Sequence, residues 1–281
     1  MRSPIAVAPG HSRLLAAGVV LAAQSLLLSL SAVPATADGG QPVPARGTAR
    51  MGQGVLEHEG VLGRPADVDR AAVARTEGVD VSSHQGNVAW PTLWKSGVKW
   101  AYVKATEGTS YRNPYWTQQY RGSYDAGMIR GGYHFATPDT SGGAAQADYF
   151  ADHGGAWSKD GKTLPGVLDI EYNPYGATCY GRTKSQMVSW IKSFLDRYKS
   201  RTGRDAVIYT STNWWTQCTG NYSGFGSRNP LWVARYASTV GTLPAGWSFQ
   251  TMWQYTSTGA TVGDHDRFNG DLARVKELAT G

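Results

Sequence analysis

Residues 166–171 read Gly-Val-Leu-Asp-Ile-Glu, a short apolar run that ends on two acidic residues. Such a run, bounded by Gly and rich in branched side chains, is typical of a buried β-strand. Further strand-like runs, apolar and rich in β-branched or aromatic residues, occupy 78–81, 100–104, 130–135, 206–210, 231–235 and 249–255, with 167–170 as the fourth in chain order.

Helical patterns lie between the early runs. Asn113-Pro114 predicts a helix start with a stop at Gly127, and residues 183–201 repeat apolar side chains at helical spacing before Gly203. Strand followed by helix, five times over, predicts a parallel sheet. We therefore expect one α/β domain, a barrel of (β/α) type whose last portion, beyond about Asn229, is rich in strands.

The first quarter of the chain has a different composition. All 11 Trp, 15 Tyr and 6 Phe lie at or after Trp90. Residues 1–37, with basic residues, an apolar run and the triplet Ala35-Thr36-Ala37, predict a secretory signal peptide; the alternative is a membrane anchor. Residues 38–76 are rich in Gly, Pro, Ala and Arg and predict a disordered linker or pro-segment with a short helix at 66–74. We expect the catalytic domain to span 77–281, and removal of 38–76 to change neither its fold nor its activity.

Charge and cysteines narrow the class of partner. The 27 basic and 21 acidic residues give a net charge of +6 without a basic run interleaved with aromatics, which disfavours nucleic acid; an anionic surface such as a bacterial wall remains possible. The two cysteines of an exported chain, Cys179 and Cys218, predict a disulfide that stabilises by about 4 kcal/mol, the alternative being two free thiols. The number and spacing of the cysteines offer no zinc site, and we expect a secreted monomer.

Acidic residues lie at the ends of several predicted strands, and in a (β/α) barrel the carboxyl ends of the strands carry the active site. The acids are Asp80, the pair Asp169 and Glu171, and Asp264 with Asp266. Asp169 and Glu171 point to one face, about 6.6 Å apart along the strand, so their repulsion raises at least one pKa. A general acid beside a stabilising carboxylate is what glycoside hydrolysis needs. The alternative is that both acids only cap a loop.

Aromatic residues near the strand ends complete this prediction, because sugar rings stack their C–H faces on aromatic side chains. We expect substrate contacts from Tyr133, Tyr209, Tyr236, Trp253 and Gln254.

At these positions the chain resembles glycoside hydrolase family 25, the N,O-diacetylmuramidase type of bacterial lysozyme. The motifs that carry the resemblance are Gly78-Val79-Asp80-Val81-Ser82-Ser83-His84-Gln85-Gly86, Tyr102-Val103-Lys104-Ala105-Thr106-Glu107-Gly108, Arg130-Gly131-Gly132-Tyr133-His134-Phe135, Leu168-Asp169-Ile170-Glu171, Trp253-Gln254-Tyr255 and Asp264-His265-Asp266. His265 departs from the apolar residue expected between the two acids.

The resemblance implies a flattened (β/α)5(β)3 barrel, hydrolysis of the β-1,4 bond from N-acetylmuramic acid to N-acetylglucosamine in peptidoglycan, and no cofactor. It implies that Glu171 is the general acid and Asp169 the second catalytic carboxylate, with Asp80 and Asp266 in support.

Three catalytic routes stay open at this point, because an i, i+2 pair falls between the carboxyl separations of a direct nucleophile and of a base that activates water. In the third route, which we favour, the substrate's own 2-acetamido group attacks while Asp169 stabilises the charged ring. Two other functions also stay open: a barrel enzyme that cleaves chitin, and a saccharide-binding module without activity.

Overall fold

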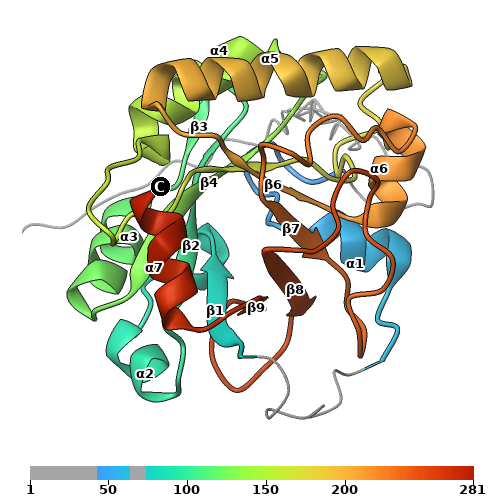
Figure 1. Cartoon of the computed structure of the whole chain (residues 1–281). Coiled ribbons are helices and arrows are strands. Elements are labelled where there is room, and N and C mark those ends of the chain that lie inside the picture. Colours follow the sequence, from blue (N-terminus) through green and yellow to red (C-terminus); the bar gives the residue numbers. More distant parts are fainter. Residues whose placement is uncertain (1–42, 64–73) are drawn as a thin grey trace, which may run out of the picture. The chain divides into compact units, whose positions relative to one another are not determined.

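The computed structural model describes residues 43–63 and 74–281. In these stretches nine strands form one sheet, in the order β1-β9-β8-β7-β6-β5-β4-β2-β3, and β1 also pairs with β2. This last pairing closes eight strands into a barrel, with the two-residue β3 as an extra edge on β2 (Figure 1). The strands are β1 (Thr76–Val81), β2 (Trp100–Glu107), β3 (Tyr111–Arg112), β4 (Ile129–Phe135), β5 (Val167–Asp169), β6 (Val207–Thr210), β7 (Leu231–Ala234), β8 (Met252–Thr256) and β9 (Asp264–Phe268).

One helix precedes the barrel, others follow its first five parallel strands and lie around its outside, and one follows its last strand. They are α1 (Gln53–Glu59), η1 (Ser83–Gln85), α2 (Trp90–Lys95), α3 (Trp116–Asp125), α4 (Gly143–Phe150), η2 (Ala151–Gly155), α5 (Lys184–Thr202), α6 (Thr212–Thr219) and α7 (Leu272–Thr280). The units β1-α2, β2-α3, β4-α4, β5-α5 and β6-α6 precede three strands without intervening helices, which confirms the (β/α)5(β)3 prediction.

The long helix shows how local sequence sets these boundaries. Thr183 accepts a hydrogen bond from the Gln186 backbone N–H while the Gln186 side chain accepts one from the Thr183 N–H, a capping box at the start of α5. Gly203 ends the helix in the left-handed conformation. The helix predicted from Asn113-Pro114 begins later, at Trp116, because Asn113 uses its side chain to accept from the Tyr115 N–H in a turn.

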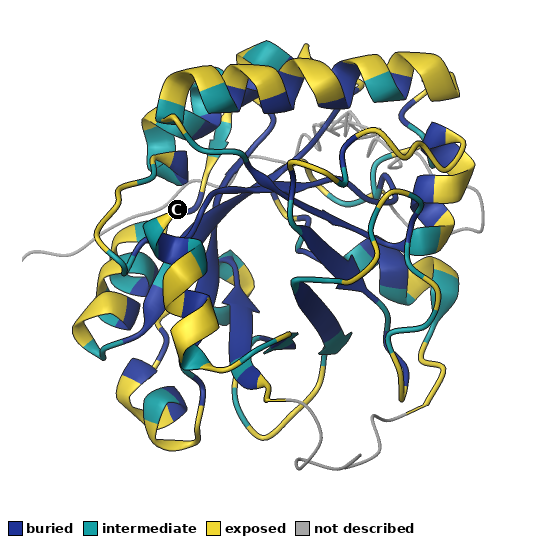
Figure 2. Cartoon of the chain, viewed as in Figure 1, coloured by how far each residue is buried: buried dark blue, intermediate teal, exposed yellow. Residues whose placement is uncertain are grey.

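Strand alternation separates two buried layers. Side chains that point outward, such as Val79 and Val81, pack against Trp90 and Leu93 of the α2 region. The inward side chains fill one end of the barrel with aromatic rings, where Trp232 contacts both Trp100 and Tyr102. Figure 2 shows most of the barrel strands buried, while the helices expose their outer faces.

The last strand differs in direction from a uniform barrel. β9 runs antiparallel to both neighbours, with Asp264 opposite Asp80 and Asp266 opposite Gly78. The acids of the final motif therefore stand at the beginning of a strand, not at its end. Because an antiparallel strand starts where its neighbours finish, they still reach the carboxyl end of the parallel strands.

The N-terminal stretch is not a bare linker, and the expectation that it adds nothing to a core is wrong for residues 43–63. This part forms α1, and Ala49, Met51 and Val55 are at most 1% exposed. These three apolar side chains are buried against the barrel, so the segment joins the core without an aromatic residue of its own. The predicted signal peptide (1–37) and nearly all of the predicted helix at 66–74 lie outside the described residues.

The predicted disulfide is confirmed: Cys179, in the loop after β5, is bonded to Cys218 of α6. Across the described residues, none of the helices has the length and apolar character needed to cross a membrane.

Candidate active site

Two carboxyl groups are buried side by side where β5 ends. Asp169 and Glu171 are each 0% exposed, and Ile170 between them belongs to the apolar core. Burial, followed by the charge of Glu171, raises the pKa of Asp169 well above its usual range. Within the described residues, neither carboxylate oxygen of Asp169 has a hydrogen-bond partner. The predicted pair is therefore brought together and kept away from water.

Glu171 is held in a different way. Burial raises its pKa to about 8, although hydrogen bonds from the backbone N–H groups of Gly52, Val55 and Gly54 act in the opposite direction. A carboxyl group with this pKa carries a proton at neutral pH, which is the state that a general acid requires.

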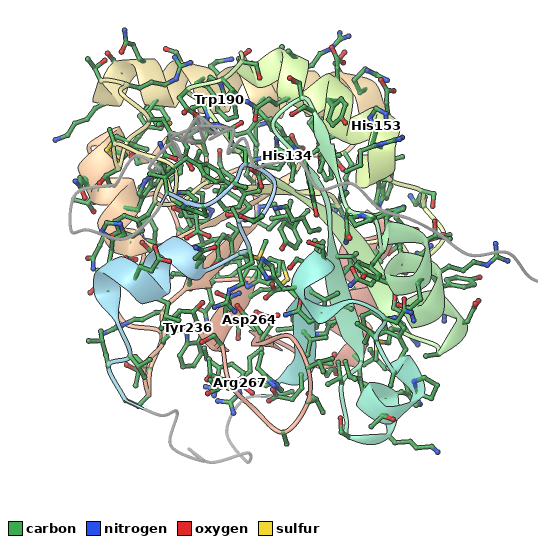
Figure 3. The ribbon with its side chains drawn as sticks, turned by 180° about the vertical axis from the view of Figure 1, so that it is seen from behind. His134, His153, Trp190, Tyr236, Asp264 and Arg267 are labelled. Carbon is green, nitrogen blue, oxygen red and sulfur yellow. A yellow bond between two sulfur atoms is a disulfide. The ribbon has the colours of Figure 1, made fainter. Side chains whose placement is uncertain are left out.

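Gln254 organises the opposite side of the site. Its Nε2 donates to Asp80 Oδ2 at 2.7 Å, and its Oε1 accepts from the hydroxyls of Tyr209 at 2.6 Å and Tyr236 at 2.8 Å. This amide therefore joins residues from β1, β6, β8 and the loop after β7. In Figure 3, Tyr236 and Asp264 lie next to each other below α1.

The other predicted supporting acid sits deeper. Asp266 is 0% exposed and faces the aromatic layer near Trp232. Burial and the charges of Asp80 and Asp264 raise its pKa well above the usual range. The acid nearer the mouth is Asp264, which stands opposite Asp80 and has a pKa raised to about 7, chiefly by burial. The sequence motif contained Asp264, but the supporting role was assigned to Asp80 and Asp266 and not to Asp264.

The predicted aromatic residues divide between the two faces of the sheet. Tyr133 points into the barrel beside the acids: its pKa is raised by burial and by the charges of Asp80 and Asp169, and its hydroxyl makes no hydrogen bond within the described residues. Trp253 is not part of this group. It packs on the outer face with Leu231 and Val233, and its Nε1 donates to the carbonyl of Arg235.

Sequence reasoning missed a buried ion pair at the end of β2. Lys104 is fully buried, and its Nζ lies 2.7 Å from Glu107 Oε2; Glu107 also accepts from the Tyr175 hydroxyl at 2.6 Å. The available signal was strand alternation, since Trp100, Tyr102 and Lys104 share the inward face. Within residues 43–63 and 74–281, His, Cys, Asp and Glu form no group of three or more with the geometry of a metal site.

The site thus contains a proton donor, Glu171, and a second buried carboxyl, Asp169. Among the described residues, no cation lies at salt-bridge distance from Asp169. Hydroxyl and amide groups nearby can bind a polar ligand. This is the chemistry of glycosidic bond cleavage.

Comparison with known proteins gives the same class. Residues 79–264 match the family model described as glycosyl hydrolases family 25. "Lysozyme M1" of Streptomyces globisporus is 44% identical over 270 residues, covering 92% of each chain, and an "N,O-diacetylmuramidase" of Chalaropsis sp is 48% identical over 209 residues, covering 73% of this chain and 99% of that one. The solved muramidase from Acremonium alcalophilum is 54% identical, with a TM-score of 0.72, and 73% of this chain covers 99% of that structure.

About a quarter of this chain thus has no counterpart in the Chalaropsis and Acremonium proteins, whereas the Streptomyces match extends beyond the barrel. The fold, the buried carboxyl pair and the family match agree, and the chain is a glycoside hydrolase that belongs to glycosyl hydrolases family 25.

Proposed function

We propose that this protein is a muramidase that hydrolyses the β-1,4 bond between N-acetylmuramic acid and N-acetylglucosamine in peptidoglycan. The observation that carries the proposal is the buried pair at the end of β5, where Glu171 has a pKa raised to about 8 and Asp169 lies beside it. The names of relatives that share 44% and 48% of their residues with this chain support the choice of substrate.

Glu171 acts as the general acid. It gives its proton to the glycosidic oxygen while the bond to the anomeric carbon breaks, and such a transfer contributes about 10² to 10⁴ in rate. Asp169 faces the positive charge that develops on the sugar ring, and the low polarity that raises its pKa also strengthens its attraction for that charge.

The supporting residues hold the ring in place. Asp80 accepts from Gln254 and so orients that amide, and Asp266 supports the site from deeper in the barrel, while Tyr133, Tyr209, Tyr236 and Gln254 offer hydroxyl and amide groups to the substrate. Trp253 is left out of this set because it packs on the outer face.

The route that we favour uses the substrate's 2-acetamido group as the nucleophile. Its carbonyl oxygen attacks the anomeric carbon while the leaving-group oxygen takes the proton of Glu171. Water then opens the oxazolinium ion at the anomeric carbon and gives a proton back to the Glu171 carboxylate. Two inversions leave the β anomer. Proton NMR of a fresh hydrolysate should therefore show the β product first, whereas an α product would mean that water attacks directly.

The experiment that tests the function identifies the new reducing end. The purified chain, with and without limited proteolysis, is incubated with peptidoglycan and with chitin oligomers. Reducing muramic acid is the expected product; reducing glucosamine from chitin would favour the chitin-cleaving alternative. Glu171→Gln should lose the activity, while the matched Glu277→Gln, in an exposed residue of α7, should retain it.

The same proposal covers location. A wall-degrading monomer is exported by the signal predicted at 1–37, so protein recovered from culture medium should begin near Asp38 or later. An intact Met1 in exported protein would contradict this.

A further inference from the structure

Residues 43–63, which we call the plug segment, lie across the mouth of the barrel on top of the carboxyl pair. Met51 is fully buried there, and Arg50 reaches to 3.8 Å from Asp264. The protein thus covers its own candidate active site with a piece of chain that precedes the barrel. The blue helix α1 of this segment lies beside the barrel strands in Figure 1.

The plug segment occupies both oxygens of the proposed general acid. The Gly52 N–H donates to Glu171 Oε1 at 2.6 Å, and the Val55 N–H donates to Oε2 at 3.2 Å. For catalysis, one of these oxygens must instead donate its proton to a glycosidic oxygen. The substrate and the plug segment therefore compete for the same atoms.

The contacts extend to one side of the acid pair as far as β2. Lys104 Nζ donates to the carbonyl oxygens of Gly47 and Ala49, and the Gly47 N–H donates to Glu107 Oε1 at 2.7 Å. The Ala49 N–H donates to the Tyr175 hydroxyl at 3.0 Å. The plug segment offers backbone groups to all three of these side chains, so it takes up their capacity to bind a polar ligand.

On the other side the contacts reach the loop after β7 and helix α6. The Tyr236 hydroxyl oxygen lies 3.2 Å from the Gly52 carbonyl oxygen, and the Leu62 N–H donates to the Tyr236 carbonyl at 2.7 Å. Glu59 accepts from Tyr172 at 3.0 Å and from Asn213 at 2.9 Å. These ties hold both ends of α1.

Close approach at this position requires glycine. A Cβ on Gly52 would lie 2.0 Å from Tyr236 Oη and 2.4 Å from Gln254 Oε1, and Gly52 also has a φ of +77°. Gly60, at the end of α1, has a similar φ of +68°, but a Cβ there would meet nothing within 4 Å. A comparison of substitutions at the two glycines therefore distinguishes the effect of backbone strain from that of a steric clash in the site.

We propose that the plug segment is an inhibitory pro-segment: while it is docked, the chain is a latent glycosidase, and its departure opens the site. The inference rests on the proposed function, since it assumes that the covered acids act on a glycan. Gly63 and Arg75 are exposed at the ends of the connection to β1. Hydrolysis of a peptide bond between them consumes one water, leaves a new carboxylate and a new amine, and turns the plug segment into a separable peptide.

The first test compares three full-length proteins: the parent, Gly52→Val and Gly60→Val. Gly52→Val should expel the plug segment and raise kcat/KM on soluble peptidoglycan fragments at least tenfold, while Gly60→Val should match the parent. Equal rates for Gly52→Val and the parent, with near-UV circular dichroism showing a folded barrel in both, would overturn the proposal.

A second test covers the case in which Gly52→Val does not fold. A full-length chain is given a recognition sequence for a site-specific protease between Gly63 and Ala74, then cut and diluted. Activity should rise after cutting, because a tethered segment acts at an effective concentration of about millimolar that dilution removes. A synthetic peptide of residues 43–63 should restore inhibition, and the same peptide with Gly52→Val should not; failure of the parent peptide to inhibit would refute the proposal.

The two proposals can fail separately. If the cut protein releases muramic acid no faster than the uncut one, the muramidase assignment stands and the pro-segment does not. If neither form cleaves peptidoglycan, the muramidase assignment fails. The pro-segment proposal is then tested by the binding of N-acetylglucosamine oligomers. The oligomers should then bind the cut protein alone and be displaced by the peptide; equal binding to both forms would refute occlusion.

Discussion

The ends of β5 and β2 both bury carboxyl groups, but they treat them in opposite ways. At β2, Glu107 is paired at 2.7 Å with the fully buried Lys104. At β5, no cation lies within salt-bridge distance of Asp169 or Glu171 among the described residues, and burial raises both pKa values. At β2 the carboxyl group has a cationic partner, whereas the pair at β5 has none and so favours holding a proton, which Glu171 carries at neutral pH.

This difference separates the carboxyl group at β2, which binds a cation, from the carboxyl pair at β5, which can take part in a reaction. A carboxylate paired with a buried cation has no proton to give, whereas Glu171, which is buried without such a partner, holds a proton that it can donate. We therefore expect substitutions at β2 to act mainly on stability, and substitutions at β5 to act mainly on turnover.

The largest expected contrast is between Glu171→Gln and Glu107→Gln. Glu171→Gln removes the transferable proton without leaving a charge unpaired, so kcat should fall about 100-fold or more without any loss of unfolding free energy at pH 7. Glu107→Gln leaves the Lys104 ammonium buried without its partner and should cost about 3 to 5 kcal/mol of unfolding free energy. Single-turnover assays and urea unfolding of both variants measure the two effects.

A Glu171→Gln variant with near-normal turnover would contradict the role of Glu171. A Glu107→Gln variant as stable as the parent would mean that the ion pair at β2 does not stabilise the fold. The contrast drawn between the ends of β2 and β5 would then not hold.

The second prediction sharpens the β5 side. Asp169→Asn removes the charge that faces the developing cation, so turnover should fall to a degree similar to that in Glu171→Gln. The same change spares the fold from burying an acid beside Glu171, so the unfolding free energy at pH 7 should rise. Asp80→Asn and Asp266→Asn serve as comparisons; if either abolishes turnover while Asp169→Asn is mild, the second catalytic carboxylate has been misassigned.

The β5 site could be predicted from the sequence because its signal lies in side chains at fixed spacing. Asp169 and Glu171 follow an apolar strand, period-two alternation puts them on one face, and barrel topology brings Asp80 to the same end. The same alternation, applied to 253–254, would have placed Trp253 opposite to Gln254. The prediction chose the aromatic for its chemistry and overlooked its register.

The plug segment could not be predicted in this way, because it binds mainly through its backbone. The N–H groups of Gly52 and Val55 and the carbonyls of Gly47 and Ala49 make the decisive contacts. Almost any residue supplies such groups, so composition shows only a Gly-rich stretch without aromatics. Strand β9 was not among the predicted runs, and its direction could not be predicted from the motif Asp264-His265-Asp266, because strand sense is set by the neighbouring strands.

The smallest expected effect is a pH dependence of stability that belongs to the β5 side. An unfolded Glu titrates near pH 4.3, whereas Glu171 in the fold has a pKa raised to about 8. Between these values the folded protein binds a proton that the unfolded chain lacks, so this contribution to stability is fully present below pH 4.3 and lost as the pH rises through 8. Asp264, with a pKa raised to about 7, acts in the same direction.

Urea unfolding of the full chain from pH 5 to 8 should show stability falling with pH. In Glu171→Gln the slope should be shallower by up to about 1.4 kcal/mol per pH unit, while the exposed Glu277→Gln should keep the parent slope. If Glu171→Gln and the parent have the same slope, Glu171 is ionised across this range, and the distinction between the two strand ends does not hold for it.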